Sequence, residues 1–210
     1  MTPTDARQYA PATLRNRDPI LDFFKQWFPT QAKILEIASG TGEHGLYFSQ
    51  QLPEVIWQPS DINPLAIASI EAWQAKQGTP NFLAPLLLNM LAEQWWDFSS
   101  STKAGFQPNV LVSINMIHIS PWATALGLFE GAKSLLTTQD LVYIYGPFKQ
   151  NGQHTSESNL AFDQSLRARN PEWGVRDLED VITIANDSGF ELLKVESMPA
   201  NNLSVLFQKI

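Results

Sequence analysis

Residues 33–44 read KILEIASGTGEH, and this stretch decides the fold that we expect. Residues 33–38 form a short apolar run typical of a buried strand, and residues 43–51 have the spacing of a helix. Gly40 and Gly42 lie between the two, where glycine lets the chain turn tightly. This order predicts a βα unit whose helix N-terminus offers N–H groups to a polar ligand.

The same unit repeats further along the chain. A strand over residues 55–61 leads into a helix that begins at Pro64 and ends before Gly78. A third strand over residues 81–89 contains Pro85, which places it near the edge of the sheet. The next three predicted elements are a central strand over residues 110–115, a helix over 122–136 and a strand over 141–145.

The two ends of the chain depart from this rhythm. Asp18 and Pro19 are expected to begin the first helix, which leaves residues 1–17 as an N-terminal arm. Residues 149–173 form a polar insertion, expected as a loop followed by a helix near the active-site rim. A helix over 178–188 precedes two strands, 190–198 and 203–209, whose tight connection makes them antiparallel.

These elements predict a single α/β domain over residues 1–210. We expect a Rossmann-like seven-stranded sheet, mostly parallel, with an antiparallel C-terminal hairpin strand and helices on both faces.

Composition excludes several classes of function. The chain has 14 Lys and Arg against 21 Asp and Glu, a formal charge of −7, which argues against binding to a nucleic-acid backbone. It has no cysteine and three scattered histidines, so neither a thiolate nucleophile nor a metal site is expected. Since no leader and no apolar run of membrane-spanning length is apparent, we expect a cytoplasmic protein without a membrane partner.

Asp61 adds a second feature to the glycine turn. It ends the second predicted strand, where a carboxylate can accept hydrogen bonds from both hydroxyls of a ribose. A glycine turn alone often serves packing only, whereas the turn together with Asp61 indicates a nucleoside.

With these residues the chain resembles the class I S-adenosylmethionine-dependent methyltransferases over almost its whole length. A narrower resemblance, to a small methyltransferase-like family formerly labelled a domain of unknown function, rests on seven segments: RNRDPI (15–20), EIASGTGEH (36–44), WQPSD (57–61), INM (114–116), YGP (145–147), NPEWG (170–174) and MPANN (198–202). The resemblance implies the fold, the cofactor S-adenosyl-L-methionine, and cofactor contacts from Glu36, Ser39, Gly40, Gly42 and Asp61.

Two positions depart from the pattern of the superfamily. Ala38 stands where the first glycine of the loop is expected, and alanine fits only if its φ stays negative. Asn89 stands where the resemblance implies an aspartate that meets the adenine amine. The amide oxygen of Asn89 can accept the same N–H without the assistance of a charge.

The segment after the fourth strand holds the candidates for catalysis. His118 is expected to accept a proton from the substrate, or to serve the structure of the loop. Asn115 is expected to touch the cofactor or orient the substrate, or else to pack. Tyr145 ends the fifth strand on the ligand-binding rim, where its hydroxyl points at the substrate or its ring fills the core.

Further polar residues have two interpretations each. Arg15 and Asn16 fold back over the methionine carboxylate, or are solvated. His44 contacts the amino-acid end of the cofactor, or lies at the surface. Asn201 and Asn202 are turn formers or functional residues, and Trp173 lines a substrate pocket or packs.

The function that follows is methyl transfer from S-adenosyl-L-methionine to a small molecule. One alternative is a protein that binds S-adenosylmethionine or S-adenosylhomocysteine without turnover. The other is an NAD(P)-dependent oxidoreductase, since Tyr145 and Lys149 match the spacing of a dehydrogenase motif. That motif needs one helical turn, which Gly146 and Pro147 do not allow. Apart from a small-molecule substrate the residues indicate no partner and no oligomeric state.

Overall fold

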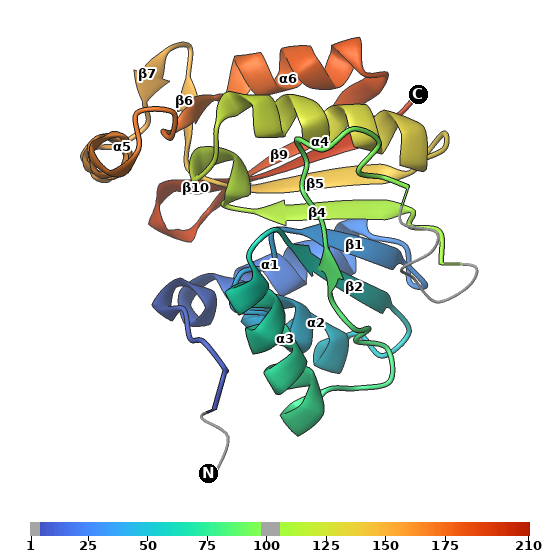
Figure 1. The fold of residues 1–210 in the computed structure, drawn as a ribbon. Helices are drawn as coiled ribbons and strands as arrows, with labels where there is room; N and C mark the ends of the chain where they lie inside the picture. The colour runs from blue at the N-terminus through green and yellow to red at the C-terminus, as the bar shows by residue number, and fades with distance from the viewer. Residues whose placement is uncertain (1–4, 98–105) are drawn as a thin grey trace. The chain divides into compact units, whose positions relative to one another are not determined.

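A computed structural model describes residues 5–97 and 106–210. Figure 1 shows their helices and strands. The α-helices are α1 (Pro11–Trp27), α2 (Glu43–Gln51), α3 (Pro64–Gln77), α4 (Trp122–Leu135), α5 (Glu157–Arg169) and α6 (Leu178–Asp187), and the 3-10 helices are η1 (Met116–His118) and η2 (Pro199–Asn201). The strands are β1 (Lys33–Ile37), β2 (Ile56–Asp61), β3 (Leu86–Leu87), β4 (Val110–Ile114), β5 (Leu141–Gly146), β6 (Phe148–Gln150), β7 (Gln153–His154), β8 (Arg176–Asp177), β9 (Phe190–Met198) and β10 (Asn202–Lys209).

The main sheet has seven strands in the order β3-β2-β1-β4-β5-β10-β9. Strand β2 pairs in parallel with both β1 and β3, and β10 runs antiparallel to both β5 and β9. The predicted fold class is therefore confirmed, including the antiparallel hairpin at the C-terminal end. Strand β4 is central and β3 is at the edge, as expected, although β3 has only two residues.

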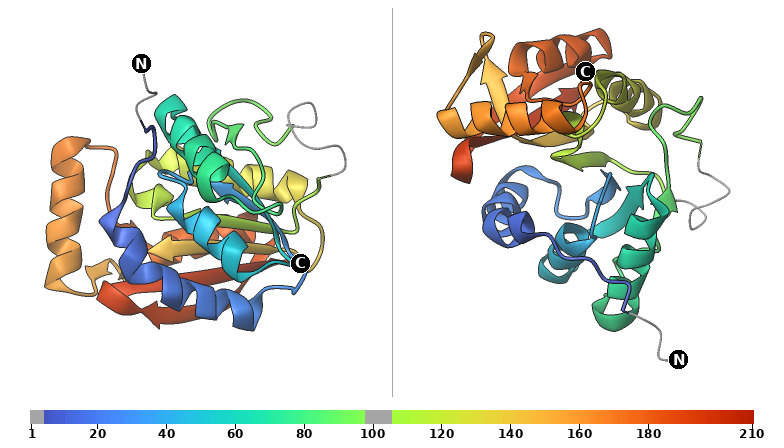
Figure 2. Two further views of the ribbon diagram at one scale, coloured as in Figure 1. Left: turned by 90° about the horizontal axis from the view of Figure 1, so that it is seen from below. Right: turned by 60° about the vertical axis from the view of Figure 1, so that its left-hand side comes forward.

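The chain forms two compact units. The first unit comprises Met1–Asn89 and Asp97–Val112, with α1, α2 and α3 beside β1 and β2 (Figures 1 and 2). Its core is aromatic: the Phe48 ring lies 4.9 Å from that of Phe24 and 5.3 Å from that of Trp57. All three side chains are at most 1% exposed. Burial of large rings on this scale holds α1 and α2 against the strands.

Helix α1 begins at Pro11 and not at Asp18, so the predicted start of this helix is wrong. Pro19 lies inside the helix, where it removes one backbone hydrogen bond. The buried side of the helix continues through this position, from Thr13 and Asn16 to Ile20. Packing on both sides of the proline outweighs the lost bond, and only residues 5–10 of the described chain precede the helix.

The second unit comprises Met90–Trp96 and Ser113–Ile210. Helix α6 packs on α4 and on β9, and the Phe129 ring of α4 lies 5.5 Å from the ring of Phe207 in β10. The pairing of β9 with β10 shifts by one residue next to Phe207, which leaves Leu193 as an extra residue in the outer strand. A bulge of this kind bends a strand and weakens its free edge as a template for pairing.

The polar insertion is more regular than predicted. Strands β6 and β7 form a hairpin before α5, and β8 completes a small sheet of order β7-β6-β8. The turn of the hairpin is Asn151-Gly152, with φ of 51° and 73°. Asn-Gly is the pair preferred in two-residue hairpin turns with positive φ at both positions. The expectation of a plain loop over this part of the insertion is therefore wrong.

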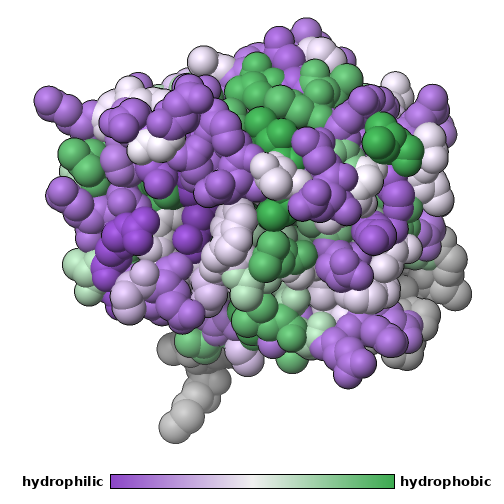
Figure 3. Space-filling model, turned by 90° about the horizontal axis from the view of Figure 1, so that it is seen from above, coloured by the Kyte–Doolittle hydropathy of each residue, from purple (hydrophilic) through white to green (hydrophobic). Residues whose placement is uncertain are grey.

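Figure 3 shows one face of the molecule, where apolar patches lie among polar side chains. Within residues 5–97 and 106–210, no helix is both long and apolar enough to cross a lipid bilayer.

Candidate functional site

The glycine loop, residues 38–42, joins β1 to α2 in the first unit. Ala38, Gly40 and Gly42 all have positive φ, at 59°, 56° and 85°. The expectation that Ala38 keeps a negative φ is therefore wrong. The turn requires the left-handed conformation at this position, which is unfavourable for alanine because its Cβ approaches the backbone.

The glycines of this region differ in what surrounds them. A Cβ on Gly42 would lie 2.8 Å from Cγ1 of Ile70 in α3, and one on Gly45 would lie 2.5 Å from Nε1 of Trp57. Gly42 therefore allows the start of α2 to pack closely on α3, and Gly45 allows α2 to pack closely on β1 and β2. A Cβ on Gly40 would meet no atom within 4 Å. Gly40 thus borders open space, as expected where a ligand approaches the backbone closely.

Asp61, at the end of β2, faces this loop. Its Oδ2 accepts the N–H of Gly40 at 2.9 Å, and its Oδ1 accepts the N–H of Asn63 at 2.8 Å. The residue is 7% exposed. Because a carboxylate has about four acceptor positions, both oxygens keep capacity for hydroxyl donors.

Ser39 ties the loop to β2. Its N–H donates to Ser60 O at 2.8 Å, and its Oγ accepts the N–H of Ser60 at 3.1 Å. The N–H of Gly42 donates to Ser39 O at 3.1 Å. The N–H groups of Ser39, Gly40 and Gly42 are therefore already used within the protein. The expectation that the loop presents free N–H groups to a ligand is therefore wrong for these three N–H groups.

Glu36 supports the loop from behind. It is 2% exposed, and Trp57 Nε1–H donates to its Oε2 at 2.9 Å. Burial raises the pKa of Glu36 to about 7, against hydrogen bonds from Trp57 and Ser39 that hold it down. The same Oε2 lies 2.9 Å from the Cβ position of Gly45. The contacts of Glu36 thus include Trp57 of β2 and the closely packed start of α2.

Asn16 and His44, both predicted to contact the cofactor, contact each other. His44 Nε2 lies 2.8 Å from Asn16 Oδ1, and the amide oxygen accepts, so Nε2 carries the proton. Burial, together with the nearby charge of Arg17, lowers the pKa of His44 to about 4. Arg15 is exposed on α1, and Asn89 is exposed two residues after β3.

Two apolar residues next to Asp61 were missed at the level of sequence. Ile62 follows Asp61 directly, and Leu87 is the partner of Asp61 in the β2–β3 pairing. They are 57% and 65% exposed. Large apolar side chains this exposed at the end of a strand, next to a carboxylate, suit the flat face of a base. Their position directly beside Asp61 was the available signal.

The second unit brings together Asn115, His118 and Tyr145. The N–H of Asn115 donates to Tyr145 O at 2.7 Å, and Asn115 itself has a φ of 63°. His118 is 0% exposed and Tyr145 is 1% exposed. A Cβ on Gly146 would lie 2.5 Å from His118 Nε2, so only glycine fits beside this ring.

His118 is held as a neutral ring. Its Nδ1 accepts the N–H of Arg176 at 3.4 Å, and its edge contacts the Phe148 ring at 5.0 Å. Burial lowers the pKa of His118 to about 3, with a further contribution from Arg176. The proton-accepting role predicted for His118 is not supported by these surroundings, and the burial of Tyr145 gives its hydroxyl no exposed face.

Arg176 and Asp163 fasten the NPEWG segment, residues 170–174, and sequence reasoning passed over both. The Arg176 guanidinium donates to the carbonyl oxygens of Ile117, Ser120 and Glu172 at 2.6 to 2.9 Å. Asp163 Oδ1 accepts the N–H of Val175 at 2.7 Å. These bonds tie the insertion to the turn that carries His118.

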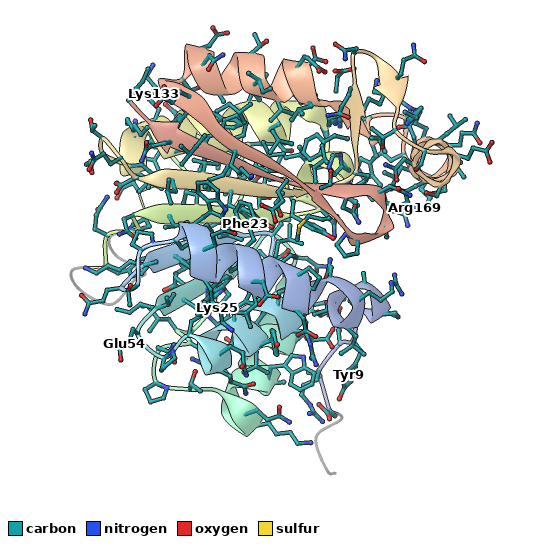
Figure 4. All side chains as sticks on the ribbon, turned by 180° about the vertical axis from the view of Figure 1, so that it is seen from behind. Tyr9, Phe23, Lys25, Glu54, Lys133 and Arg169 are labelled. Atoms are coloured by element: carbon teal, nitrogen blue, oxygen red, sulfur yellow. The ribbon has the colours of Figure 1, made fainter. Side chains whose placement is uncertain are left out.

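Three other predicted positions have mainly structural contacts. The Trp173 ring is half-buried and lies 5.1 Å from the guanidinium carbon of Arg169, which Figure 4 labels. Asn201 has a φ of 58°, and its carbonyl accepts the side-chain N–H of Asn159 at 2.9 Å. Asn202 Nδ2 donates to the carbonyl of Pro199 at 3.0 Å. Both asparagines therefore form the turn of the β9–β10 connection.

Comparison with solved structures gives the class of fold. The chain resembles an O-methyltransferase family protein from Burkholderia thailandensis, with a TM-score of 0.76 and 14% identity over 94% of this chain and 57% of that one. An O-methyltransferase family 2 protein from Planctomyces limnophilus, in complex with apigenin, has a TM-score of 0.76 and 13% identity over 93% and 56%. This chain therefore spans little more than half the length of these two proteins.

A third structure matches over nearly its full length. It is a putative sarcosine dimethylglycine methyltransferase from Galdieria sulphuraria, with a TM-score of 0.70 and 15% identity over 97% of this chain and 92% of that one. The fold is thus the one that these three methyltransferase structures share. Residues 7–209 match the family model described as "Protein of unknown function (DUF938)", and the chain belongs to this family.

Proposed function

We propose that this protein is a methyltransferase that binds S-adenosyl-L-methionine on the glycine loop of the first unit and methylates a small molecule. The observation that carries the proposal is the open space at Gly40, in a region where Gly42 and Gly45 are closely packed. The methyltransferase fold of the solved structures supports it.

The residues around the loop fit an adenosyl group. The oxygens of Asp61 retain acceptor capacity for the two ribose hydroxyls. Ile62, the residue after Asp61, and Leu87, its partner in β3, offer exposed apolar surface to the adenine. Asn89, exposed after β3, remains a predicted contact of the adenine amine.

The charges around the loop favour a sulfonium over a dinucleotide. A pyrophosphate is normally bound by free N–H groups of a glycine loop and helix N-terminus. Here three loop N–H groups are used internally, and the Glu43 carboxylate lies in the first turn of α2. Carboxylates at Glu43 and Asp61 repel a phosphate and attract a cation.

Methyl transfer on this proposal divides the work between the cofactor and the chain. Bound S-adenosylmethionine supplies a methyl group on a positively charged sulfur that leaves readily. The chain contributes orientation and exclusion of water, and methyl transfer of this kind needs few obligatory protein groups. Since His118 and Tyr145 are buried, methyl transfer on this proposal relies on the position of the substrate and not on proton removal by either side chain.

A protein that binds the cofactor without turnover is the second candidate. The observation that favours it is the burial of His118 and Tyr145, the predicted proton acceptor and substrate contact. The oxidoreductase is disfavoured, since Tyr145 ends β5 and Lys149 lies in β6, so the two do not share a helical turn. Transfer of radiolabelled methyl groups to small molecules of a cell extract separates an enzyme from a binding protein.

The direct test is calorimetry with S-adenosylhomocysteine, NAD and NADP on the wild-type chain and on Gly40→Ala. We expect binding of S-adenosylhomocysteine alone. In Gly40→Ala the added methyl group fills space that the ligand needs, which weakens binding by about 1–3 kcal/mol, roughly 5- to 150-fold.

The matched control is Gly189→Ala. Gly189 also has a positive φ, 84°, and open space around its Cβ position, but it precedes β9 in the second unit. Both variants should lose about 1 kcal/mol of stability from backbone strain, whereas only Gly40→Ala should lose affinity. Equal affinity in the two variants contradicts the site, and binding of NAD in place of S-adenosylhomocysteine contradicts the cofactor.

A further inference from the structure

The segment before α1, residues 5–10, lies along α3 in an extended conformation, and we call it the N-terminal strap. Figure 4 labels Tyr9 within it, and Figure 2 shows the segment running beside α3. The N–H of Gln8 donates to Oγ of Ser69 at 2.8 Å, and the N–H of Ala10 donates to Oε2 of Glu43 at 2.5 Å. Two backbone groups of the strap are therefore fixed by side chains of α3 and α2.

Both of these side chains also hold Thr41. Ser69 Oγ–H donates to Thr41 O at 2.8 Å, and Thr41 Oγ1–H donates to Glu43 Oε2 at 3.0 Å. Thr41 lies between Gly40 and Gly42. Ser69 and Glu43 thus each connect the strap to the middle residue of the glycine loop, one through the backbone of Thr41 and the other through its hydroxyl.

The outer part of the strap is held by Trp73. The guanidinium carbon of Arg7 lies 4.6 Å from the Trp73 ring, and the Arg7 side chain is 9% exposed. Trp73 Nε1–H donates to Gln8 O at 3.2 Å. A stacked guanidinium and a paired indole make the docked strap a defined state rather than a loose end.

We propose that the docked strap positions the glycine loop for the cofactor, so that strap docking and cofactor binding strengthen each other. This inference rests on the proposed function and assigns Glu43 and Ser69 as positioning residues, which act through Thr41. The loop contains Ala38 in a strained conformation, so it needs external contacts to hold its shape. When the strap undocks, Ser69 and Glu43 lose the backbone N–H groups that hold their side chains in place. Their bonds to Thr41 then fix the loop less firmly, and the space at Gly40 is less well kept in shape.

Coupling of this kind is reciprocal, since each binding event must raise the affinity of the other by the same factor. A cofactor that binds more tightly when the strap is docked therefore shifts the strap towards its docked state. This predicts a change at Arg7, whose side chain is covered while the strap is docked.

The first experiment is limited trypsin digestion of the full chain, followed by mass spectrometry of the cut between Arg7 and Gln8. Trypsin must engulf the arginine side chain, so the cut reports undocking of the strap. Saturating S-adenosylhomocysteine should slow this cut by about tenfold. A cut whose rate does not change with bound ligand overturns the coupling.

The second experiment measures the affinity for S-adenosylhomocysteine by calorimetry in Glu43→Ala and Ser69→Ala. Each should lose about tenfold in affinity, and Glu43→Gln should recover part of the loss because its amide oxygen still accepts hydrogen bonds. The control is Glu71→Ala, an exposed glutamate of α3. It should bind like the wild-type chain.

A variant lacking residues 1–10 shows whether the strap carries the effect. Glu43→Ala should cost much less affinity in this shortened chain than in the full chain, since its strap partner is gone. Equal losses in both chains overturn the inference, and unchanged affinity in both point variants does so even where the shortened chain fails to fold. Wild-type protein that binds no S-adenosylhomocysteine defeats the proposed function instead.

Discussion

Ala38 and Gly40 have nearly the same φ, 59° and 56°, but they contribute differently to the glycine loop. A Cβ on Gly40 would enter the open space that the proposed cofactor needs, whereas Ala38 adopts a conformation that glycine would adopt more easily. The sequence identified both positions as part of the loop. It did not reveal the positive φ of Ala38, because that angle follows from how the whole turn closes.

Replacement of Ala38 by glycine should therefore stabilise the protein. We expect Ala38→Gly to raise the free energy of unfolding by about 1 kcal/mol, since glycine pays no steric penalty at positive φ. Urea denaturation without ligand measures the change.

The control for this prediction is the same substitution in a helix. Ala161 is exposed within α5, and Ala161→Gly should lower the free energy of unfolding by about 1 kcal/mol. Destabilisation by both substitutions would show that Ala38 is not strained.

The candidate site could be predicted from sequence only in part. Asp61 and Gly40 were predicted from a motif, and the structure brings them together through one hydrogen bond. The directions in which Glu36 and His118 point could not be predicted. They depend on Trp57 and Arg176, residues distant in sequence whose contacts arise only when the chain is folded.

Among the elements, a helix could be predicted from local sequence where glycine or proline marks its ends. Helices α2 and α3 begin and end where glycine and proline predicted. Helix α1 was misjudged because Pro19 has two possible roles, at a helix start or inside a helix, and only packing of the preceding turns decides between them. The hairpin of β6 and β7 was missed since its strands are short and polar.

The NPEWG segment depends on Gly174. This residue has a φ of 156°, and a Cβ on it would lie 2.7 Å from Oδ1 of Asp163. Gly174→Ala should therefore displace Asp163 from the N–H of Val175 and lower the free energy of unfolding by about 2–4 kcal/mol, from strain and overpacking together. Urea denaturation measures the loss.

Gly189→Ala is also the control for Gly174→Ala, because it adds backbone strain without overpacking. Gly189 has a positive φ but no atom near its Cβ position, so only the strain of about 1 kcal/mol is expected. Losses of similar size at Gly174 and Gly189 would mean that Asp163 moves aside at little cost.

At the scale of the whole molecule, the buried side chains of His44, His118 and Glu36 contribute to the dependence of stability on pH. The pKa values of His44 and His118 are lowered from 6.5 to about 4 and about 3. Below pH 6.5 the two histidines therefore bind protons in the unfolded chain but not in the folded chain. The folded state becomes less stable as the pH falls through this range. The pKa of Glu36 is raised to about 7, so its stabilisation is present below pH 4.5 and is lost as the pH rises to 7.

Between pH 4.5 and 6.5 these groups leave the unfolded chain with about one extra proton. The free energy of unfolding should therefore rise by about 1.4 kcal/mol per pH unit from these groups. Glu36→Gln should roughly double this slope and His44→Gln should nearly remove it, as urea denaturation at several pH values measures. If the slope is the same in the wild-type chain and in both variants, burial does not disfavour the charged forms of Glu36 and His44 as their shifted pKa values require.

Strand β10 follows β9 along the chain, yet it lies between β9 and the earlier strand β5. Until β10 is in place, the edge of β5 and the edge of β9 that it joins both lack a pairing partner. Loss of β10 would therefore leave two strand edges unpaired at once. Because unpaired strand edges are templates for association with other chains, a variant truncated before residue 202 should aggregate, as light scattering of the refolded chain measures.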